Sequence, residues 1–362
     1  MIAVAASKTS NSTPPPLILA AVLAASLVAG CAAGGPGQLG GASEQTFTTA
    51  AAADYLRRQN LPALECVEPW QNPDYPSALK LLTRHYCVYT TLLDPLMLRR
   101  LAGFLESAHR QYNRQLPVAV ETDIRFTVYL FADRPQWEKF TRSFAGSAAC
   151  AYLKIKAGAY YLNGSVVAYN IGRQATFSVL GHEGWHQFNH RHFKFRLPSW
   201  LDEGIATLFE TYRYDNGQFY FEPGRNLYRL AQLKKTLAAN RMIPLRKLIS
   251  LNPGEVLGDH GDKATAAFYS QSYALVRFLR EDNYGQRLAD YHRLLLGGLD
   301  GKWPLPPPAA RIAADRNIPV TAHWNRTVSP LLFEYYITAD LDQLQQQYLA
   351  FCRKIVYRVQ LK

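Results

Sequence analysis

Two histidines four residues apart, His182 and His186, restrict the possible folds of this chain more than any other feature of its sequence. They lie in the stretch His182-Glu183-Gly184-Trp185-His186, which has the composition of a buried helix. On an α-helix, side chains four residues apart lie one above the other on the same face. Two imidazoles placed in this way can occupy two corners of a tetrahedral zinc site, with Glu183 beside the metal as a general base. The motif is short enough to occur by chance, so its context decides its meaning.

A second predicted helix, from about Trp200 to Tyr212, supplies that context. Glu203 is the candidate third ligand, which completes a His2Glu set and leaves the fourth position open for water. Glu210 lies two turns further along the same face, where it can accept the free N–H of a ligand histidine and fix its tautomer. His190 could extend the histidine face, but Glu203 has the better context. We therefore expect one Zn2+ here. Two core histidines near a surface glutamate are the alternative, which leaves the clustering of ionisable groups within apolar helices without a cause.

The paired motifs resemble those of the gluzincin metallopeptidases, and especially the peptidase-MA-like proteins of unknown function found in bacterial envelopes. The resemblance covers about residues 80–355 and rests on the His-Glu-x-x-His motif, the segment Trp200-Leu-Asp-Glu203-Gly, and Glu210. It implies an α+β, zincin-like catalytic domain with a small mixed sheet, a helix carrying the two histidines, and a helical C-terminal half. It also implies that His182, His186 and Glu203 bind zinc, and that Glu183 is the general base in hydrolysis of a peptide or protein substrate.

Peptide hydrolysis passes through a tetrahedral intermediate whose oxyanion needs a donor. Many gluzincins use a tyrosine well downstream of the glutamate ligand. Tyr269 lies 66 residues past Glu203, a separation similar to that in the aminopeptidase branch, and is our first choice. Tyr273, on the same helical face, is the second, and a core role remains open for both. No Gly-x-Met-Glu-Asn-like segment precedes the zinc motif, so recognition of a free N-terminus is unsupported and an endopeptidase is favoured.

The N-terminus predicts export. One charge, Lys8, precedes the largely apolar run Leu17–Gly30. This run is short for a membrane span but suits a signal peptide. The segment Leu27-Val-Ala-Gly-Cys31 resembles a bacterial lipobox, which implies cleavage before Cys31, lipidation of its sulfur and a membrane anchor. Ala32 favours a cell-envelope lipoprotein in the outer membrane, facing the periplasm. An ordinary secretory signal and an uncleaved anchor are the alternatives.

The expected domain organisation has three parts. Residues 32–53 are small and flexible in composition, as in a tether. We expect a lipoprotein signal peptide at 1–30, a flexible tether with an N-terminal extension at 31–79, and the metallopeptidase domain at 80–362.

A hairpin is predicted just before the zinc motif. Ala157–Leu162 and Ser165–Tyr169 have strand composition and meet at Asn163-Gly164, a strong turn signal. We expect Ser165–Tyr169 to border the active-site cleft. Its edge would then pair with an extended substrate backbone.

The charge balance is basic, with 40 Lys and Arg against 28 Asp and Glu, a net charge of +12 at pH 7. This balance permits an anionic partner such as a lipid head group, a wall polymer or an acidic peptide. A solvated basic surface is the simpler interpretation. No block of Lys and Arg with interleaved aromatic residues resembles a nucleic-acid module, so no nucleic-acid partner is expected. A monomer is expected.

Four cysteines besides Cys31 allow two disulfides in an exported protein, with three possible connectivities. The favoured pairing is Cys66 with Cys87, which closes a short loop, and Cys150 with Cys352. None lies at ligand spacing with a histidine, so no second metal site is expected.

The sequence thus predicts a zinc-dependent peptidase anchored in the bacterial cell envelope. A hypothesis of another class is a catalytically silent zinc-binding lipoprotein that acts as a binding or scaffold module. Glu183 argues against it, because a purely structural site needs no base beside the metal.

Overall fold

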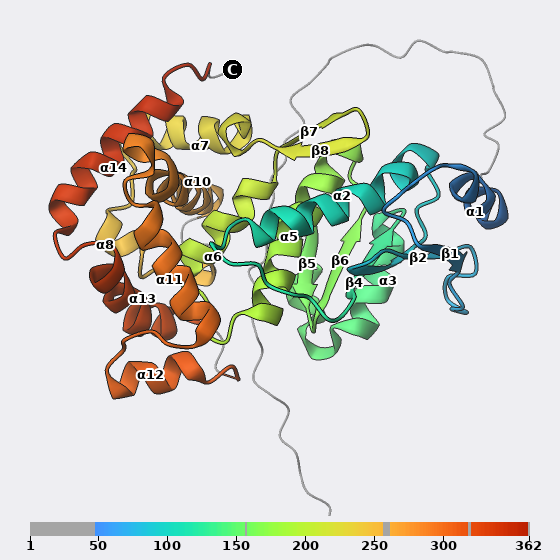
Figure 1. The fold of residues 1–362 in the computed structure, drawn as a ribbon, viewed down its shortest axis with the longest axis horizontal. Coiled ribbons are helices and arrows are strands. Elements are labelled where there is room, and N and C mark those ends of the chain that lie inside the picture. The colour runs from blue at the N-terminus through green and yellow to red at the C-terminus, as the bar shows by residue number, and fades with distance from the viewer. Residues whose placement is uncertain (1–47, 156–157, 256–260, 318–319, 361–362) are drawn as a thin grey trace, which may run out of the picture.

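The computed structural model describes residues 48–155, 158–255, 261–317 and 320–360 (Figure 1). These residues form an α+β fold in which a small mixed sheet occupies the N-terminal half and helices build the C-terminal half. The predicted signal peptide and the lipidation site Cys31 lie outside the described residues. None of the described helices combines the length and the apolar composition needed to cross a membrane.

The sheet has six strands in the order β1-β2-β3-β4-β6-β5. Parallel pairing joins β4 to β3 and to β6, and all other neighbours are antiparallel. The strands are β1 (Cys66–Pro69), β2 (Leu79–Leu82), β3 (Tyr86–Thr90), β4 (Phe126–Phe131), β5 (Ala159–Leu162) and β6 (Ser165–Tyr169).

Strand side chains alternate between the two faces of the sheet, and helices cover both faces. Val166 and Ala168 of β6 join the large core with α2 (Pro95–Asn113) and α5 (Arg173–His192). Val167 and Tyr169 of the same strand pack instead with Trp137 of α3 (Arg134–Phe144), and α4 (Ala149–Tyr152) lies on that side too. The sheet is therefore a rigid layer behind α5.

The predicted hairpin forms, but the prediction about its edge is wrong. Asn163 and Gly164 have φ of 50° and 80°, the left-handed conformation that a two-residue hairpin turn requires. Within the sheet β6 is bonded on one side to β4 and on the other to β5, so it has no free edge. The edge strand on this side of the sheet is β5, which packs against α5.

The predicted domain start at residue 80 is also wrong, because it falls inside β2. Helix α1 (Thr49–Arg58) buries Ala52 and Leu56 in the same core as Leu79. Strand β1 was not predicted, because the sequence before residue 78 is rich in proline. The fold therefore includes α1 and β1, and the flexible extension cannot reach residue 79.

The C-terminal half surrounds α10 (Gly261–Glu281), which packs against α6, α7, α11 and α14. A β-hairpin and helices α12 and α13 were not predicted. The remaining elements are α6 (Ser199–Ala206), β7 (Tyr212–Asp215), β8 (Gln218–Phe221), α7 (Leu227–Ala238), α8 (Leu245–Leu248), α11 (Leu288–Asp300), α12 (Pro307–Ala314), α13 (Ala322–Tyr336) and α14 (Leu341–Val356).

The predicted disulfides do not form, and Cys66, Cys87, Cys150 and Cys352 are all free. Cys66 of β1 and Cys87 of β3 both lie opposite Leu82 of β2, which runs between them. Neighbouring strands are about 4.8 Å apart, which places the two Cα atoms about 10 Å apart. A disulfide spans no more than roughly 7 Å between Cα atoms. Cys150 is exposed whereas Cys352 is buried in α14, so this pair does not meet either.

Candidate metal centre

Glycines allow the helices around α5 to approach closely. A Cβ atom on Gly181 would lie 2.5 Å from the carbonyl oxygen of Phe209, and one on Gly184 would lie 2.4 Å from the hydroxyl of Tyr112. On α6, a Cβ on Gly204 would lie 2.6 Å from the Ser272 carbonyl oxygen of α10. Backbone therefore packs directly on its neighbours at three positions in and beside the two motif helices.

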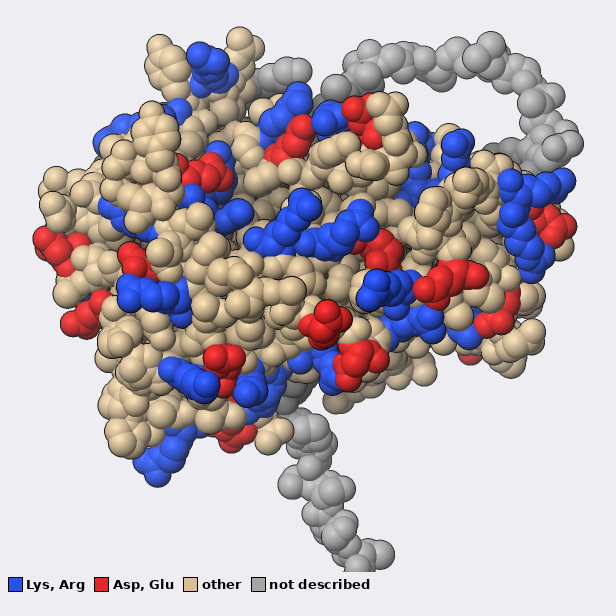
Figure 2. Space-filling model, viewed as in Figure 1, with Lys and Arg blue, Asp and Glu red and all other residues tan. Residues whose placement is uncertain are grey.

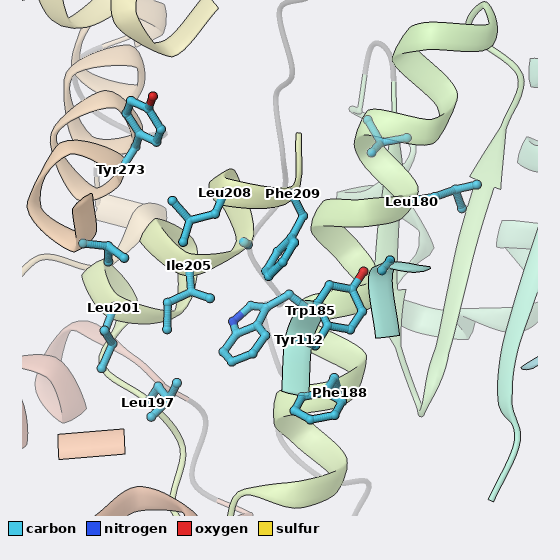
Figure 3. Close-up of a cluster of buried hydrophobic side chains, with 14 of the residues drawn as sticks. Tyr112, Leu180, Trp185, Phe188, Leu197, Leu201, Ile205, Leu208, Phe209 and Tyr273 are labelled. Atoms are coloured by element: carbon cyan, nitrogen blue, oxygen red, sulfur yellow. The ribbon is translucent and has the colours of Figure 1, made fainter. Parts of the chain in front are cut away.

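An aromatic cluster fixes the relative position of these helices (Figure 3). Trp185, Phe209 and Tyr112 gather between α5 and the end of α6. The rings of Tyr112 and Phe209 meet edge to face at 4.6 Å between centroids, and the Tyr112 hydroxyl donates to the Gly181 carbonyl at 2.7 Å. Aromatic pairs of this kind add about 0.5–1.5 kcal/mol each beyond the burial of their surface. The backbone that carries the histidines is thus held from its apolar side.

His182, His186 and Glu203 converge on one point. One ligand atom from each lies within 4.8 Å of the others. Glu203 Oε2 is 3.3 Å from His182 Nε2 and 3.6 Å from His186 Nε2. Three ligand atoms bound to one zinc at about 2.0–2.2 Å in a tetrahedron lie about 3.3–3.6 Å apart. Both separations from Glu203 Oε2 therefore match those of ligands on a single tetrahedral metal ion.

The same three atoms have no hydrogen-bond partner within the described chain, although they are buried. A buried polar atom without a partner costs about 1–3 kcal/mol. Three such atoms pointing at one another are unusual in a folded protein, where most buried polar groups are paired. A cation at this point would satisfy all three, and the donor set of two imidazoles and a carboxylate suits zinc.

Each ligand histidine is held through its other ring nitrogen by a carboxylate. His182 Nδ1 lies 3.1 Å from Glu210 Oε1, and His186 Nδ1 lies 3.1 Å from Asp202 Oδ1. A carboxylate that accepts from Nδ1–H fixes the tautomer in which Nε2 is free for a metal. The sequence pointed to Glu210 but not to Asp202. The signal was present, since Asp202 directly precedes the glutamate ligand at the start of α6.

A buried arginine in turn holds Glu210. Arg229 of α7 donates from Nε to Glu210 Oε2 at 2.8 Å and from an Nη to Oε1 at 2.6 Å. Asn226, which caps the same helix, donates to Glu210 Oε2 at 2.9 Å. Arg229 was not predicted, because nothing in the sequence shows that the start of α7 returns to α5.

The electrostatics separate the two glutamates of the site. Burial would raise the pKa of Glu203, but the adjacent His186 and His182 outweigh it and lower the pKa to about 2. For Glu183, the two histidines also lower the pKa, but burial outweighs them and raises the pKa to about 7. Burial would lower the pKa of His182, but its contacts with Glu203 and Glu210 raise it. Glu203 is thus an ionised carboxylate, whereas Glu183 is a buried carboxyl group with an unpaired Oε1.

Of the two candidate tyrosines, Tyr269 faces the site. Its hydroxyl is buried without a partner in the described chain, and burial, followed by the nearby Glu203 carboxylate, raises its pKa. The Tyr273 hydroxyl instead donates to the Pro223 carbonyl at 2.6 Å and accepts from Arg277 at 2.8 Å. Tyr273 is therefore a structural residue of the helical half.

His190 does not join the triad, because its Nδ1 lies 2.7 Å from the Tyr161 hydroxyl of β5. A second histidine group lies at the C-terminal end of α5. His85 and His109 stack at 3.9 Å between centroids, and the hydroxyl of Thr122 lies 3.0 Å from His109 Nε2 and 2.9 Å from His192 Nε2.

No family model matches this chain, and no curated protein matches it.

Proposed function

We propose that this protein is a zinc-dependent peptidase of the gluzincin type, with a zincin-like catalytic domain and endopeptidase activity. The observation that carries the proposal is the convergence of three unpaired, buried ligand atoms at the spacing of a tetrahedral site. Glu183, beside this point on the same helix, adds the base that a structural site does not need.

The roles of the residues follow from their positions. Zinc bound by His182, His186 and Glu203 would supply Lewis acidity and lower the pKa of a bound water. The buried Glu183 carboxylate would accept the proton of the attacking water and deliver it to the leaving nitrogen. The unpaired hydroxyl of Tyr269 would donate to the oxyanion, and Glu210 and Asp202 would hold the histidines in the required tautomer.

Location and assembly belong to the same proposal. The lipobox-like segment ending at Cys31 supports a signal peptide and a lipid anchor, and hence a lipoprotein in the cell envelope, in the outer membrane facing the periplasm. We propose that it acts as a monomer on peptide or protein substrates and has no nucleic-acid partner.

The first test is elemental analysis of the purified chain. The wild type should contain about one zinc per chain, and His186→Ala should contain none. His323→Ala is the matched control, because His323 is exposed and lies outside the site. Zinc-free wild-type protein after reconstitution would contradict the proposal.

The second test separates a peptidase from a silent zinc-binding lipoprotein. Glu183→Gln should keep its zinc and lose hydrolysis of a peptide library by about 100-fold or more, since a positioned base contributes about 10²–10⁴-fold. Turnover equal to that of the wild type would remove Glu183 from the mechanism. A wild type that binds zinc but cleaves nothing would favour the scaffold function.

A further inference from the structure

A hollow lined by four arginines lies on the outer side of α2, apart from the metal triad. Its volume is about 670 Å³, within the range of about 300–1,000 Å³ typical of small-molecule sites. One wall is α2, and the others are the segment 60–65 after α1 and the β7–β8 hairpin. Lys and Arg side chains cross the middle of the molecular face on which α2 lies (Figure 2). The hollow shares no lining residue with the triad.

The guanidinium groups reach the hollow from two directions. Arg99, Arg100 and Arg110 come from one face of α2, and Arg84 comes from the turn between β2 and β3. Arg84 and Arg99 are exposed, and neither has an ion pair or a hydrogen bond to any residue in the described ranges.

The other two arginines are held in place by neutral groups. The Arg100 guanidinium lies 4.2 Å from the centre of the Tyr214 ring on β7, a cation–π contact. Arg110 donates to the Ser107 hydroxyl at 2.8 Å. Both contacts orient a guanidinium without neutralising its charge.

The two carboxylates in the lining do not balance these charges, because each is engaged elsewhere. Glu65 pairs with Arg125 at 2.5 Å. Glu106 accepts from the Thr83 hydroxyl at 2.6 Å and from the backbone and ring of His85 at 2.8 and 2.7 Å. Glu65 has its own cation in Arg125, whereas the Thr83 hydroxyl and the His85 backbone do not neutralise Glu106. Four guanidinium groups therefore face one carboxylate that lacks an arginine or lysine partner, and the lining keeps a positive excess.

Like charges gathered around a concave site repel one another and attract an anion. Guanidinium forks match the oxygens of phosphate, and several of them can bind one phosphate group from different sides. The volume exceeds what one orthophosphate fills. We propose that the hollow formed by Arg84, Arg99, Arg100 and Arg110 binds a ligand that carries a diphosphate or an equivalent pair of phosphate groups. Such a group occurs on soluble metabolites and on lipid head groups, and the test distinguishes these two sources.

The experiment measures binding of pyrophosphate to the full chain by calorimetry at 0.15 M salt. It is repeated with vesicles of phosphatidylcholine, with and without cardiolipin, whose head group carries two phosphates, and with citrate as a non-phosphate anion. The test variant is Arg84→Ala/Arg99→Ala. Its matched control is Arg353→Ala/Arg358→Ala, which removes the same charge from exposed positions at the end of the chain. All four positions are exposed, so both variants should fold.

We expect pyrophosphate binding that weakens at least tenfold in the test variant and stays within twofold in the control. The same pattern seen only with cardiolipin vesicles would also support the site and assign its ligand to the membrane surface. No binding of either probe, an equal loss in both variants, or citrate binding as tightly as pyrophosphate would overturn the proposal. The readout does not involve hydrolysis, so the outcome is independent of the proposed peptidase activity.

Discussion

Two groups of histidines lie along α5, and they differ in what their ring nitrogens contact. In the triad, His182 and His186 each direct Nδ1 to a carboxylate and leave a buried Nε2 unpaired. At the C-terminal end of the helix, His109 and His192 share the Thr122 hydroxyl through their Nε2 atoms, and His85 directs Nδ1 to Glu106.

The difference shows how a histidine's surroundings determine its use. Burial lowers the pKa of both His109 and His192 to about 4, so these rings are neutral and act as packing and hydrogen-bonding groups. In the triad the neighbouring carboxylates raise the pKa of both histidines despite burial. Unpaired ring nitrogens surrounded by carboxylates are typical of a cation-binding site, whereas ring nitrogens that already have hydrogen-bond partners are typical of a structural role.

The largest expected difference between the triad and the second histidine group is the effect of zinc on the free energy of unfolding. Zinc at about a thousand times its dissociation constant should raise the free energy of unfolding by about 4 kcal/mol. Glu203→Ala should abolish this gain, and His109→Phe should retain it. Urea unfolding with and without chelator measures the difference. A gain that disappears in His109→Phe would mean that the two groups are not independent.

Gly184→Ala tests whether the triad depends on the close helix contact. The added Cβ would meet the Tyr112 hydroxyl at 2.4 Å, so we expect a loss of about 3 kcal/mol in stability together with weaker zinc binding. Gly103→Ala on α2 is the control, because its Cβ would meet nothing closer than 3.9 Å and a helical alanine should be neutral or stabilising. Similar thermal unfolding of both variants would contradict the close-packing argument.

Removal of one supporting carboxylate should have a smaller effect. Asp202→Ala takes away the acceptor of His186 Nδ1 and should weaken zinc binding by about 10–100-fold. Asp123→Ala, which removes an exposed partner of Arg191, is the control. Competition with a chromophoric chelator gives both constants. Unchanged affinity in Asp202→Ala would show that this carboxylate does not position the ligand.

The smallest expected effect concerns the second group of histidines, which should make the protein less stable at acidic pH. Burial, followed by the charge of His85, lowers the pKa of His109 from 6.5 to about 4, with His192 and Arg110 adding to the shift and Glu106 opposing it. Between these values the unfolded chain binds a proton that the folded chain does not, so stability falls as the pH drops from 6.5 toward 4. We expect a loss of about 2 kcal/mol from His109.

Urea unfolding of chelator-treated protein at pH 7 and pH 4.5 measures this loss, which His109→Phe should reduce. Chelator removes the contribution of metal dissociation from both measurements. An equal pH dependence in the wild type and in the variant would assign the effect to other groups.

The sequence predicted the local features well, because they depend on local rules. The Asn163-Gly164 turn follows from turn chemistry, and the contact of Glu210 with a candidate ligand histidine, found to be His182, follows from spacing. Spacing on two helices was sufficient to bring together the three candidate ligands.

The predictions that failed concern contacts between residues that are far apart in the sequence. The order of the strands, which gives the free edge to β5, depends on pairing that no local pattern encodes. The distance between Cys66 and Cys87 depends on β2 running between them. Arg229 reaches Glu210 only because α7 packs on α10 with its first turn beside Glu210, and composition could not reveal this.

The close spacing of the triad in the chain has a consequence for the order of folding. Glu203 lies 21 residues from His182, whereas Tyr269 lies 66 residues from Glu203. Closing the longer loop costs about 1 kcal/mol more in chain entropy, and it also requires α10 to dock. The two motif helices can therefore assemble as an early local unit before the helical half is in place. If the proposed zinc site forms in this unit, a nascent chain would bind the metal first and gain the tyrosine later, and the ion would act as a template for folding.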